Sequence, residues 1–413
     1  MHKTSIIILT YNNLEYTKLC LESIEKYTNK NQYELIIIDN ASTDGTKEYL
    51  KTKNNIKVIY NTENRGFPIG CNQGIELANK KNDICLLNND VIVTPNWLEN
   101  LQKSLYSKRT IGAVGPVCNN FENNQGCFLE YNGLEELENA AKKHNISNPA
   151  AWEEKNFLIG FCLLIKRSII NKLQKLDEMY TPGYIEDNDL SLRIICLGYK
   201  LLLCHDVYIH HYLGTTFRKD LTKFYPVLYK NRDYFQCKWG FSTVLFDEIK
   251  YYQLPLLNNP QKLLDVNSKI GTNALYIKFT YSIKTVHGLE ENEYQNYICQ
   301  KVIPTYQNLN KLTATPRQKY DCILLPDDYS ITKNNEILKI LAKHLKKNGY
   351  IIGTITPQIS QTETTIDTLK FYFNNLNLQL DKIIYWQNDN IINSQNLTNI
   401  TKISYRFKIS SKP

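Results

Sequence analysis

Short apolar runs that stop abruptly at polar residues recur along the first hundred residues of the chain. The clearest of these runs occupy residues 5–9, 35–38 and 84–87, and a further strand is expected at 57–60. β-branched runs of this length are typical of strands buried on both faces, and segments with the apolar spacing of helices separate them. Strands that alternate with helices predict an α/β fold with a doubly wound parallel sheet, whose functional groups gather at one edge.

The run at residues 84–87 is followed by three polar side chains. Asn88, Asn89 and Asp90 interrupt the apolar pattern before a second short run begins at Val91. A buried strand cannot carry an unpaired carboxylate at low cost, so we expect Asp90 where the strand leaves the core. In open α/β sheets this edge is where ligands bind. A helix cap or a turn would use the same residue type, and this stretch alone leaves that alternative open.

The size and charge of the chain narrow the class of protein. A length of 413 residues exceeds what a single core usually supports, so two domains are expected. The content of 42% hydrophobic and 22% charged residues is ordinary for a globular protein. A net charge of +8 is mild for this length and is compatible with an anionic ligand or an acidic membrane surface. No arginine-rich aromatic platform is apparent, so we expect no nucleic-acid partner.

The cysteines and the N-terminal residues indicate the cellular compartment of the protein. The 11 cysteines are scattered singly without a Cys-x-x-Cys pair, which indicates buried thiols in a reducing cytosol rather than disulfides or a zinc site. The chain enters a strand-like run at Ser5, and no apolar run approaches the ~20 residues that a membrane span needs. We therefore expect a cytoplasmic protein without a signal peptide, associated at most peripherally with the inner face of the membrane.

Several segments, in order, carry a resemblance to a known family. They are TYNN (10–13), IIIDNASTDGT (36–46), NTENRGFPIGCNQGI (61–75) and LLNNDVIVTPNWLENL (86–101), followed by residues 156–167, 176–178, 184–193 and 210–217. Together they resemble family 2 glycosyltransferases, and most closely the rhamnosyltransferase and galactofuranosyltransferase type. The resemblance covers about residues 4–240. It implies a GT-A fold and inverting transfer of a sugar from a nucleoside diphosphate.

The resemblance assigns metal-binding roles near Asp90. The family usually has an Asp-x-Asp triplet at this place, and only the last carboxylate remains in Asn88-Asn89-Asp90. A hard divalent cation, Mn²⁺ or Mg²⁺, would bind this carboxylate together with diphosphate oxygens. His210 or His211 would complete the shell, with a slight preference for His210. Either histidine could instead be a strand-end residue satisfied by the backbone.

By the same resemblance Asp187 is the catalytic base, with Glu186 beside it. The apolar positions that follow predict a helix that begins at these two residues, and the free amides of a first turn stabilise a carboxylate. Simple N-capping is the alternative, and it would suit Asp189 equally well. Asp189 and Arg193 have the spacing of a helical ion pair.

The remaining implied residues would bind the nucleotide-sugar. They are Thr10, Tyr11, Asn12, Asp39, Asn40, Ser42, Asp44, Arg65, Gly66, Asn72, Asn88 and Asn89. Asp39 could accept hydrogen bonds from a pyrimidine or a ribose, and Arg65 could approach a phosphate or the base. A turn-forming Asp39 and a solvated Arg65 are the alternatives.

The residues after about 255 change character. Their pattern of strand, loop and helix at 262–272, with further strands at 286–290, 320–326 and 346–353, resembles a Rossmann-like S-adenosylmethionine methyltransferase. Glu290 would stand at the ribose-binding position. Asn267, Ser268 and Lys269 replace the expected glycines, so we expect a degenerate domain for which S-adenosylmethionine is an unlikely cofactor.

These observations predict three segments and one principal function. Residues 1–250 form the glycosyltransferase domain, 251–260 a linker, and 261–413 the methyltransferase-like domain, which would serve packing, homodimerisation or acceptor docking. The donor would be a UDP- or dTDP-sugar. The acceptor would be a surface polysaccharide, a lipid-linked glycan, or a protein or peptide side chain, and no feature of the sequence separates these. A non-catalytic nucleotide-sugar scaffold and a bifunctional glycosyltransferase and methyltransferase are the alternatives.

Overall fold

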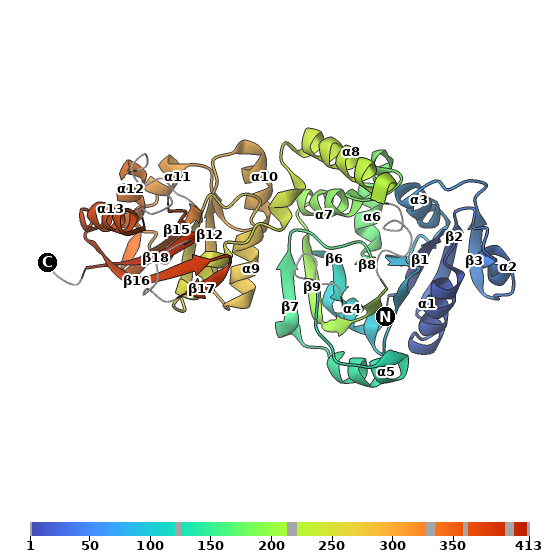
Figure 1. Cartoon of the computed structure of the whole chain (residues 1–413). Coiled ribbons are helices and arrows are strands. Elements are labelled where there is room, and N and C mark those ends of the chain that lie inside the picture. The colour runs from blue at the N-terminus through green and yellow to red at the C-terminus, as the bar shows by residue number, and fades with distance from the viewer. Residues whose placement is uncertain are drawn as a thin grey trace. The chain divides into compact units, whose positions relative to one another are not determined.

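The chain folds into two compact units, Met1–Phe246 and Asp247–Pro413, in the computed structural model (Figure 1). The structure describes residues 2–119, 125–212, 221–327, 335–357, 362–392 and 400–410. The end of the last family-like motif, residues 213–217, therefore lies outside the described residues. Within these ranges, no helix combines the length and apolar character needed to cross a membrane.

A mixed sheet with the strand order β3-β2-β1-β4-β8-β6-β9-β7 organises the first unit. Its strands are β1 Thr4–Thr10, β2 Tyr33–Asp39, β3 Ile56–Tyr60, β4 Asp83–Asn88, β6 Ile111–Val117, β7 Trp152–Lys155, β8 Cys162–Ile165 and β9 Lys200–Tyr208. The strands β3, β2, β1 and β4 are parallel, whereas β8 runs antiparallel to β4 and β7 antiparallel to β9. The predicted α/β fold is confirmed, and the two antiparallel strands make the sheet mixed.

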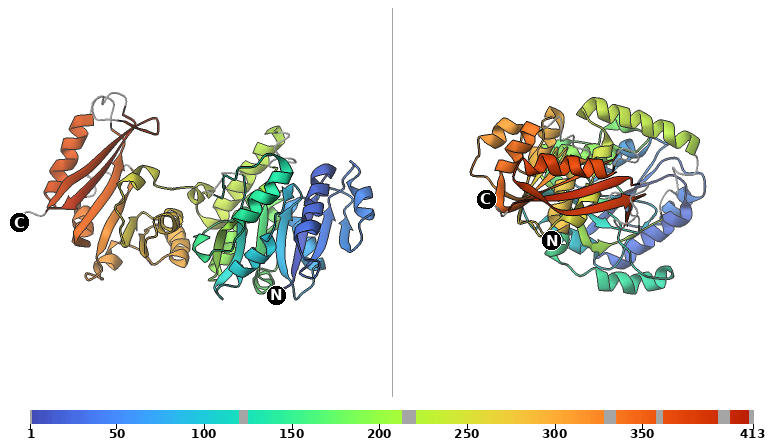
Figure 2. Two further views of the ribbon diagram at one scale, coloured as in Figure 1. Left: turned by 90° about the horizontal axis from the view of Figure 1, so that it is seen from below. Right: turned by 60° about the vertical axis from the view of Figure 1, so that its left-hand side comes forward.

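Helices cover both faces of this sheet, as the views in Figure 2 show. They are α1 Leu14–Tyr27, α2 Thr46–Lys51, α3 Phe67–Leu77, α4 Trp97–Leu105, α5 Gly133–His144, α6 Arg167–Leu173, α7 Glu186–Cys196 and α8 Leu221–Trp239, with short 3₁₀ turns η2 Pro149–Ala151, η3 Glu178–Tyr180 and η4 Thr243–Phe246. Residues of α1 and α4 join Ile6 and Ile8 of β1 in one buried cluster. The helix α3 lies on the opposite face, where a Cβ on Gly74 would stand 2.3 Å from Ile7. Glycine is needed there because helix and strand approach so closely.

The strand order of the first sheet changes direction between β1 and β4. The chain places β2 and β3 on one side of β1 and β4 on the other side, so the crossing point lies between β1 and β4. Crevices at the carboxyl ends of strands beside such a crossing are the usual ligand sites of open α/β sheets. The strand ends there carry Thr10 and Asn88, with Asp39 on the neighbouring strand.

A small second sheet brings a distant segment to this edge. The strands β5 Val91–Ile92 and β10 His210–His211 pair antiparallel, with His211 opposite Val91 and His210 opposite Ile92. This pairing places the histidine pair next to Asp90, although many residues separate them in sequence.

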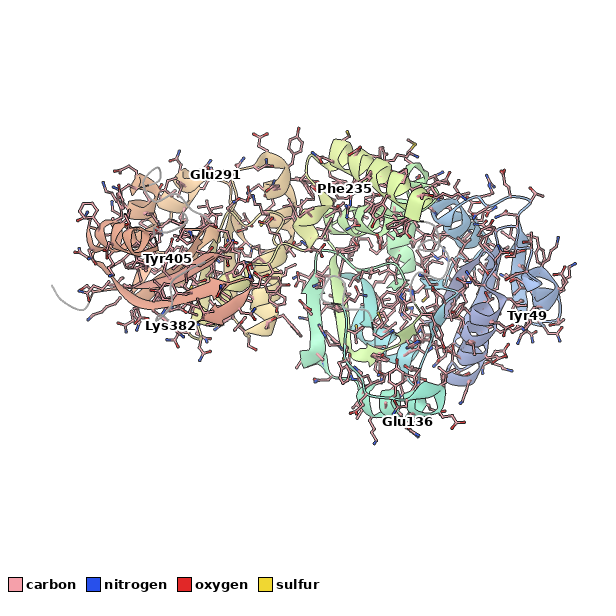
Figure 3. All side chains as sticks on the ribbon, in the orientation of Figure 1. Tyr49, Glu136, Phe235, Glu291, Lys382 and Tyr405 are labelled. Carbon is pink, nitrogen blue, oxygen red and sulfur yellow. The ribbon has the colours of Figure 1, made fainter. Side chains whose placement is uncertain are left out.

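The second unit contains another mixed sheet, in the order β13-β12-β11-β14-β15-β18-β16-β17. Its elements are η5 Tyr251–Leu256, β11 Lys262–Val266, α9 Thr272–Thr280, β12 Thr285–Leu289, α10 Glu293–Val302, β13 Thr305–Tyr306, α11 Leu309–Thr313, β14 Tyr320–Asp327, α12 Asn335–Lys343, β15 Leu345–Ile355, α13 Thr362–Asn374, β16 Leu378–Gln387, β17 Asn390–Ile392 and β18 Lys402–Ile409. The strands from β13 to β15 are parallel, and β18 runs antiparallel between β15 and β16. Aromatic side chains build its core, where Tyr405, labelled in Figure 3, packs beside Phe373 and Phe407. The segment predicted as a linker, 251–260, includes η5, whose Gln253 is buried in this unit.

Candidate active site

Asp90 and His211 meet at the carboxyl end of β4. Both side chains are largely buried, and His211 Nε2 lies 3.2 Å from Asp90 Oδ1. The His211 ring stacks on Phe161, with ring centroids 5.1 Å apart. Within the described part of the chain, the buried Nδ1 of His211 has no hydrogen-bond partner. The geometry therefore presents one carboxylate oxygen and one imidazole nitrogen side by side.

The spacing of this pair is compatible with two neighbouring ligands of a divalent cation. Adjacent ligands of an octahedral Mg²⁺, each about 2.0–2.1 Å from the ion, lie about 3 Å apart, and Mg²⁺ often takes only one or two protein carboxylates together with phosphate oxygens. Among the described residues, no group of three or more His, Cys, Asp or Glu could hold a metal.

The neighbouring histidine has a different partner. The hydroxyl of Tyr131 lies 2.5 Å from His210 Nδ1, and the rings of Tyr131 and Tyr212 pack against the His210 ring. Burial lowers the pKa of His210, and the adjacent His211 adds to this effect. In the structure, His211 rather than His210 contacts Asp90.

The two asparagines before Asp90 differ in their surroundings. Asn88 Nδ2 lies 3.5 Å from His211 Nε2, so Asn88 belongs to the cluster around Asp90. Asn89 donates to the hydroxyls of Thr10 and Thr17, at 3.3 and 3.0 Å. Asn89 thus joins β4 to β1 and α1, across the crossing point of the sheet.

Asp187 lies in the first turn of α7. Its Oδ2 accepts a hydrogen bond from Gly160 N at 3.0 Å, and its Oδ1 accepts one from Asn188 N at 2.9 Å. Burial raises the pKa of Asp187, while the amides of Gly160 and Asn188 oppose the shift. A carboxylate with a raised pKa that keeps part of its surface exposed suits a general base better than an ordinary surface aspartate.

Glu186 is more deeply enclosed than its neighbour. Burial raises the pKa of Glu186 well above its ordinary value, and the charge of Asp187 adds to the effect. Its Oε2 is buried and finds no hydrogen-bond partner among the described residues. The two adjacent carboxyl groups therefore compete for ionisation, and burial favours the protonated form of Glu186.

Long-range contacts fix the start of α7. Ile185, directly before Glu186, has the left-handed φ of 75°. The side chain of Asn231 on α8 donates to the carbonyl oxygens of Tyr180, Gly183 and Tyr184, at 2.8, 2.8 and 3.1 Å. The expected ion pair is present, with Arg193 Nη1 3.6 Å from Asp189 Oδ2, and Asp189 also accepts from Trp239 at 3.0 Å. These bonds to α8 hold the helix that carries Asp187.

Two residues directly before β8, Gly160 and Phe161, connect the surroundings of Asp187 and Asp90. Gly160 N donates to Asp187, while Phe161 O accepts from Asn88 N at 2.9 Å and the Phe161 ring stacks on His211. Neither Gly160 nor Phe161 was predicted from the sequence as an individual site residue. The available signal was a glycine at the start of the strand-like segment 156–167, which allows backbone to approach a side chain closely.

The loops after β1 and β2 are tied together. Asn12 N donates to Ser42 Oγ, and Asn12 Oδ1 accepts from Thr43 N, both at 2.8 Å. Asp39 Oδ1 accepts from Ser42 N at 3.1 Å. Tyr11 is 37% exposed beside these loops. The predicted residues Thr10, Tyr11, Asn12, Asp39 and Ser42 therefore lie together at one edge of the sheet.

The loop before α3 carries the next group of predicted residues. Asn40 Nδ2 donates to Asn64 Oδ1 at 3.2 Å and to Gly66 O at 3.3 Å. Gly66 has a left-handed φ of 78°, and a Cβ there would stand 2.7 Å from Pro182 Cα. Only glycine fits this position. Arg65 is exposed to solvent beside it.

The side chains of Asp44 and Asn72 form hydrogen bonds with other groups of the same chain. Asp44 accepts from Leu14 N at 2.8 Å and from Thr46 Oγ1 at 2.6 Å, and so connects the starts of α1 and α2. The amide of Asn72 bonds both the N–H and the carbonyl of Leu176, at 2.8 and 3.0 Å. Asp44 and Asn72, which were predicted to bind the nucleotide-sugar, therefore hold loops of the protein in place.

Comparison with known proteins finds a family match within the first unit. Residues 5–174 match the family model of glycosyl transferase family 2. This match agrees with the motifs in the N-terminal region. The match includes β4 and Asp90, and it ends before α7 and β10.

Similar proteins carry glycosyltransferase names. Glycosyltransferase AglE of Haloferax volcanii is 26% identical over 208 residues, which are 49% of this chain and 64% of that protein. The uncharacterized glycosyltransferase MJ1057 of Methanocaldococcus jannaschii is 25% identical over 283 residues, covering 64% of this chain and 93% of that protein. The O-antigen chain rhamnosyltransferase WbaN of Salmonella anatum is 26% identical over 239 residues, which are 54% of this chain and 71% of that protein.

Among solved structures, the mannosyltransferase PcManGT from Pyrobaculum calidifontis, in complex with GDP-Man and Mn²⁺, superposes with a TM-score of 0.40. It is 20% identical, and the superposition covers 52% of this chain and 58% of that chain.

Proposed function

We propose that the first unit is an inverting glycosyltransferase, which transfers a sugar from a UDP- or dTDP-sugar to a hydroxyl group of its acceptor. The family 2 match and the names of the relatives support sugar transfer. The name of WbaN, an O-antigen chain rhamnosyltransferase, supports a glycan as acceptor. A polysaccharide, a lipid-linked glycan and a protein or peptide side chain remain the acceptor classes to compare.

The observation that carries this proposal is the connection between Asp187 and Asp90 through Gly160 and Phe161. One end offers a carboxylate of raised pKa, and the other end offers a carboxylate and an imidazole at the carboxyl end of β4. In-line transfer requires a base on the attacking hydroxyl and stabilisation of charge on the leaving diphosphate, at opposite ends of the reacting sugar. A pure binding protein would not need the first of these.

In this mechanism, Asp187 takes the proton of the attacking hydroxyl as that oxygen bonds to the anomeric carbon of the sugar, and the bond from this carbon to the diphosphate breaks, so that the nucleoside diphosphate leaves. Asp90 and His211 would hold Mn²⁺ or Mg²⁺, and the ion, when bound, supplies neutralising charge for the diphosphate. The residues Thr10, Asn12 and Asp39 at the ends of β1 and β2 would orient the nucleotide. Phe161 would keep His211 in position through ring stacking.

The test is a turnover screen of the full chain against UDP-, dTDP- and GDP-sugars, with and without Mn²⁺. We expect metal-dependent hydrolysis of one donor, and its loss in Asp187→Asn. Donor binding without turnover, in the presence of a glycan acceptor panel, would favour the non-catalytic scaffold. No response to any donor would refute the proposal.

For the second unit, we propose a degenerate methyltransferase fold without a bound cofactor. Its parallel strands follow the order β13-β12-β11-β14-β15, which reverses between β11 and β14 in the manner of doubly wound nucleotide-binding folds. Asn267 and Lys269 in the loop after β11 have φ values of 57° and 54°, a conformation that glycine adopts at lower cost.

The proposal that this loop does not hold S-adenosylmethionine is supported by the bonds that its polar groups form within the protein. The ammonium of Lys250 lies 2.6 Å from Asp265 Oδ1 and donates to Val266 O at 2.8 Å, and both side chains of this ion pair are buried. The two oxygens of Glu290 accept from Lys269 N and Asn292 N, at 2.8 and 2.9 Å. Glu290, which was predicted to bind a ribose, is thus hydrogen-bonded to backbone amides of the protein itself. Calorimetry with millimolar S-adenosylmethionine should show no binding, and saturable binding would instead favour the bifunctional enzyme.

A further inference from the structure

The N-terminal half of α8 presents an aromatic surface to solvent. Tyr225 and Tyr229 are 45% and 56% exposed, and their rings lie in nearly parallel planes, 21° apart, with centroids separated by 6.0 Å. Residues four apart share one face of a helix. The opposite face of α8 is buried, as shown by Phe235, which is labelled in Figure 3 and is 0% exposed. Tyr225 and Tyr229, called here the tyrosine pair, therefore present about half of their surface to solvent.

Contacts connect the tyrosine pair to the loop that starts the helix of Asp187. Phe224 packs against Tyr225, with ring centroids 5.1 Å apart, and against Tyr184, at 4.8 Å and nearly perpendicular. The same loop is bound by Asn231 of α8, through the carbonyls of Gly183 and Tyr184. The tyrosine pair and the candidate base are thus fixed to one another by packing and by hydrogen bonds.

Charges around the tyrosine pair are mainly positive. Lys223, Lys230 and Arg232 are exposed on α8, against Asp233. Long cationic side chains next to exposed aromatic rings favour a ligand that has both apolar C–H surface and anionic groups.

We propose that the tyrosine pair binds the acceptor glycan, with successive sugar rings on Tyr225 and Tyr229 and any phosphate or carboxylate of the glycan toward Lys230 or Arg232. This inference rests on the proposed glycosyltransferase function and adds the acceptor side to it. Sugar rings have an apolar C–H face that packs on an aromatic ring, and their hydroxyls bond tyrosine hydroxyls and cations at the rim. One helical turn separates the two tyrosines, a spacing of about 6 Å along the axis that is comparable to one sugar unit.

A lipid bilayer fits the same surface less well. Helices that lie in the bilayer interface bury a wide face of Leu, Phe and Trp. Among the described residues of α8, the large hydrophobic side chains exposed to solvent are Leu221, Tyr225 and Tyr229, so a wide aliphatic face is not present in this part of the chain. The surface offers flat rings with polar rims, which is the chemistry of a glycan platform.

The experiment uses the full chain and a printed array of defined mono-, di- and longer oligosaccharides, with and without a terminal phosphate. The test variant is Tyr225→Ala with Tyr229→Ala, and Phe at both positions is the conservative variant. The matched control is Tyr294→Ala with Tyr297→Ala, because these tyrosines of α10 are also exposed, at 63% and 48%. Thermal unfolding of each variant shows that it is folded.

We expect the protein to bind an oligosaccharide of two or more sugars, and the alanine pair at Tyr225 and Tyr229 to weaken this binding by about tenfold or more. The phenylalanine pair and the α10 control should bind within about twofold of the unmodified protein. Equal glycan binding by the test variant, or no glycan binding by any protein, would overturn the inference. So would a loss confined to phosphatidylcholine–phosphatidylglycerol vesicles, which would instead indicate a membrane surface. Donor hydrolysis by the unmodified protein is measured separately, so a failure of the proposed function remains distinguishable from a failure of this inference.

Discussion

Replacing Asp187 by asparagine separates the chemical role of this side chain from its structural role. The two carboxylate oxygens accept from Gly160 N and Asn188 N, and an asparagine has only one acceptor oxygen. One of the two amides therefore loses its partner, at a cost of about 1 kcal/mol for a hydrogen bond of this kind. Removal of a carboxyl group whose pKa burial has raised offsets part of this cost. We expect only a small change in the free energy of unfolding.

The effect on turnover should be much larger. A positioned general base contributes roughly 10²–10⁴ in rate, which corresponds to about 2.7–5.5 kcal/mol at about 1.36 kcal/mol per factor of ten. Donor hydrolysis should fall by that factor in Asp187→Asn, while donor affinity, measured by calorimetry, should stay within about threefold. The raised pKa of Asp187 also predicts that the rate of the unmodified protein falls with decreasing pH earlier than an ordinary aspartate would cause.

Asp189→Asn is the matched control, because Asp189 lies in the same turn but is fully buried against Trp239 and Lys238. We expect this variant to lose stability rather than to lose turnover per folded molecule. Three results would contradict the reasoning. These are a loss of less than tenfold in Asp187→Asn, a loss that follows unfolding, and a parallel loss of donor binding.

Three further predictions concern other parts of the chain. His211→Ala or Asp90→Asn should weaken Mn²⁺ binding, measured by electron paramagnetic resonance, by at least about tenfold. His210→Ala should leave Mn²⁺ binding nearly unchanged. Equal effects of the two histidine substitutions would contradict the geometry. Glu186 has a raised folded-state pKa, so its stabilising contribution is complete below the unfolded pKa and is lost as the pH rises through the folded pKa. The Tm advantage of Glu186→Gln should therefore grow from acid to neutral pH, and a constant difference would argue against a buried protonated Glu186. Lys250→Met leaves a buried carboxylate without its ammonium partner and should destabilise the second unit by about 3–5 kcal/mol in urea unfolding, and a neutral effect would mean that the ion pair is not needed.

Local pattern determined much of the fold in both units. The apolar runs at 5–9, 35–38 and 84–87 lie within β1, β2 and β4, because side chains buried on both faces leave a continuous apolar signal. The position of Asp90 directly after β4 and that of Asp187 in the first turn of α7 follow from the same pattern, since a carboxylate cannot remain unpaired inside a strand or a helix core. The antiparallel course of β7 and β8 left no such signal, because strand direction depends on the connection and not on the run itself.

The partners of polar side chains were decided by the tertiary structure. Asn89 bonds Thr17, Asn72 bonds Leu176 and Asp44 bonds Leu14. In the sequence these asparagines and this aspartate look the same as residues that face a ligand, because hydrogen-bonding capacity is identical in both cases. Only the folded chain shows which of them hold loops together.

The choice between His210 and His211 shows most clearly that the sequence does not give the contacts of a polar side chain. Neighbouring residues of a strand point to opposite faces, so only one of the two can face Asp90. Which one does so depends on the register between β10 and β5, and a shift by one residue would exchange them. The sequence by itself determined that a histidine stands near the end of β4. Strand pairing between distant segments decided that His211 contacts Asp90 and that His210 contacts Tyr131.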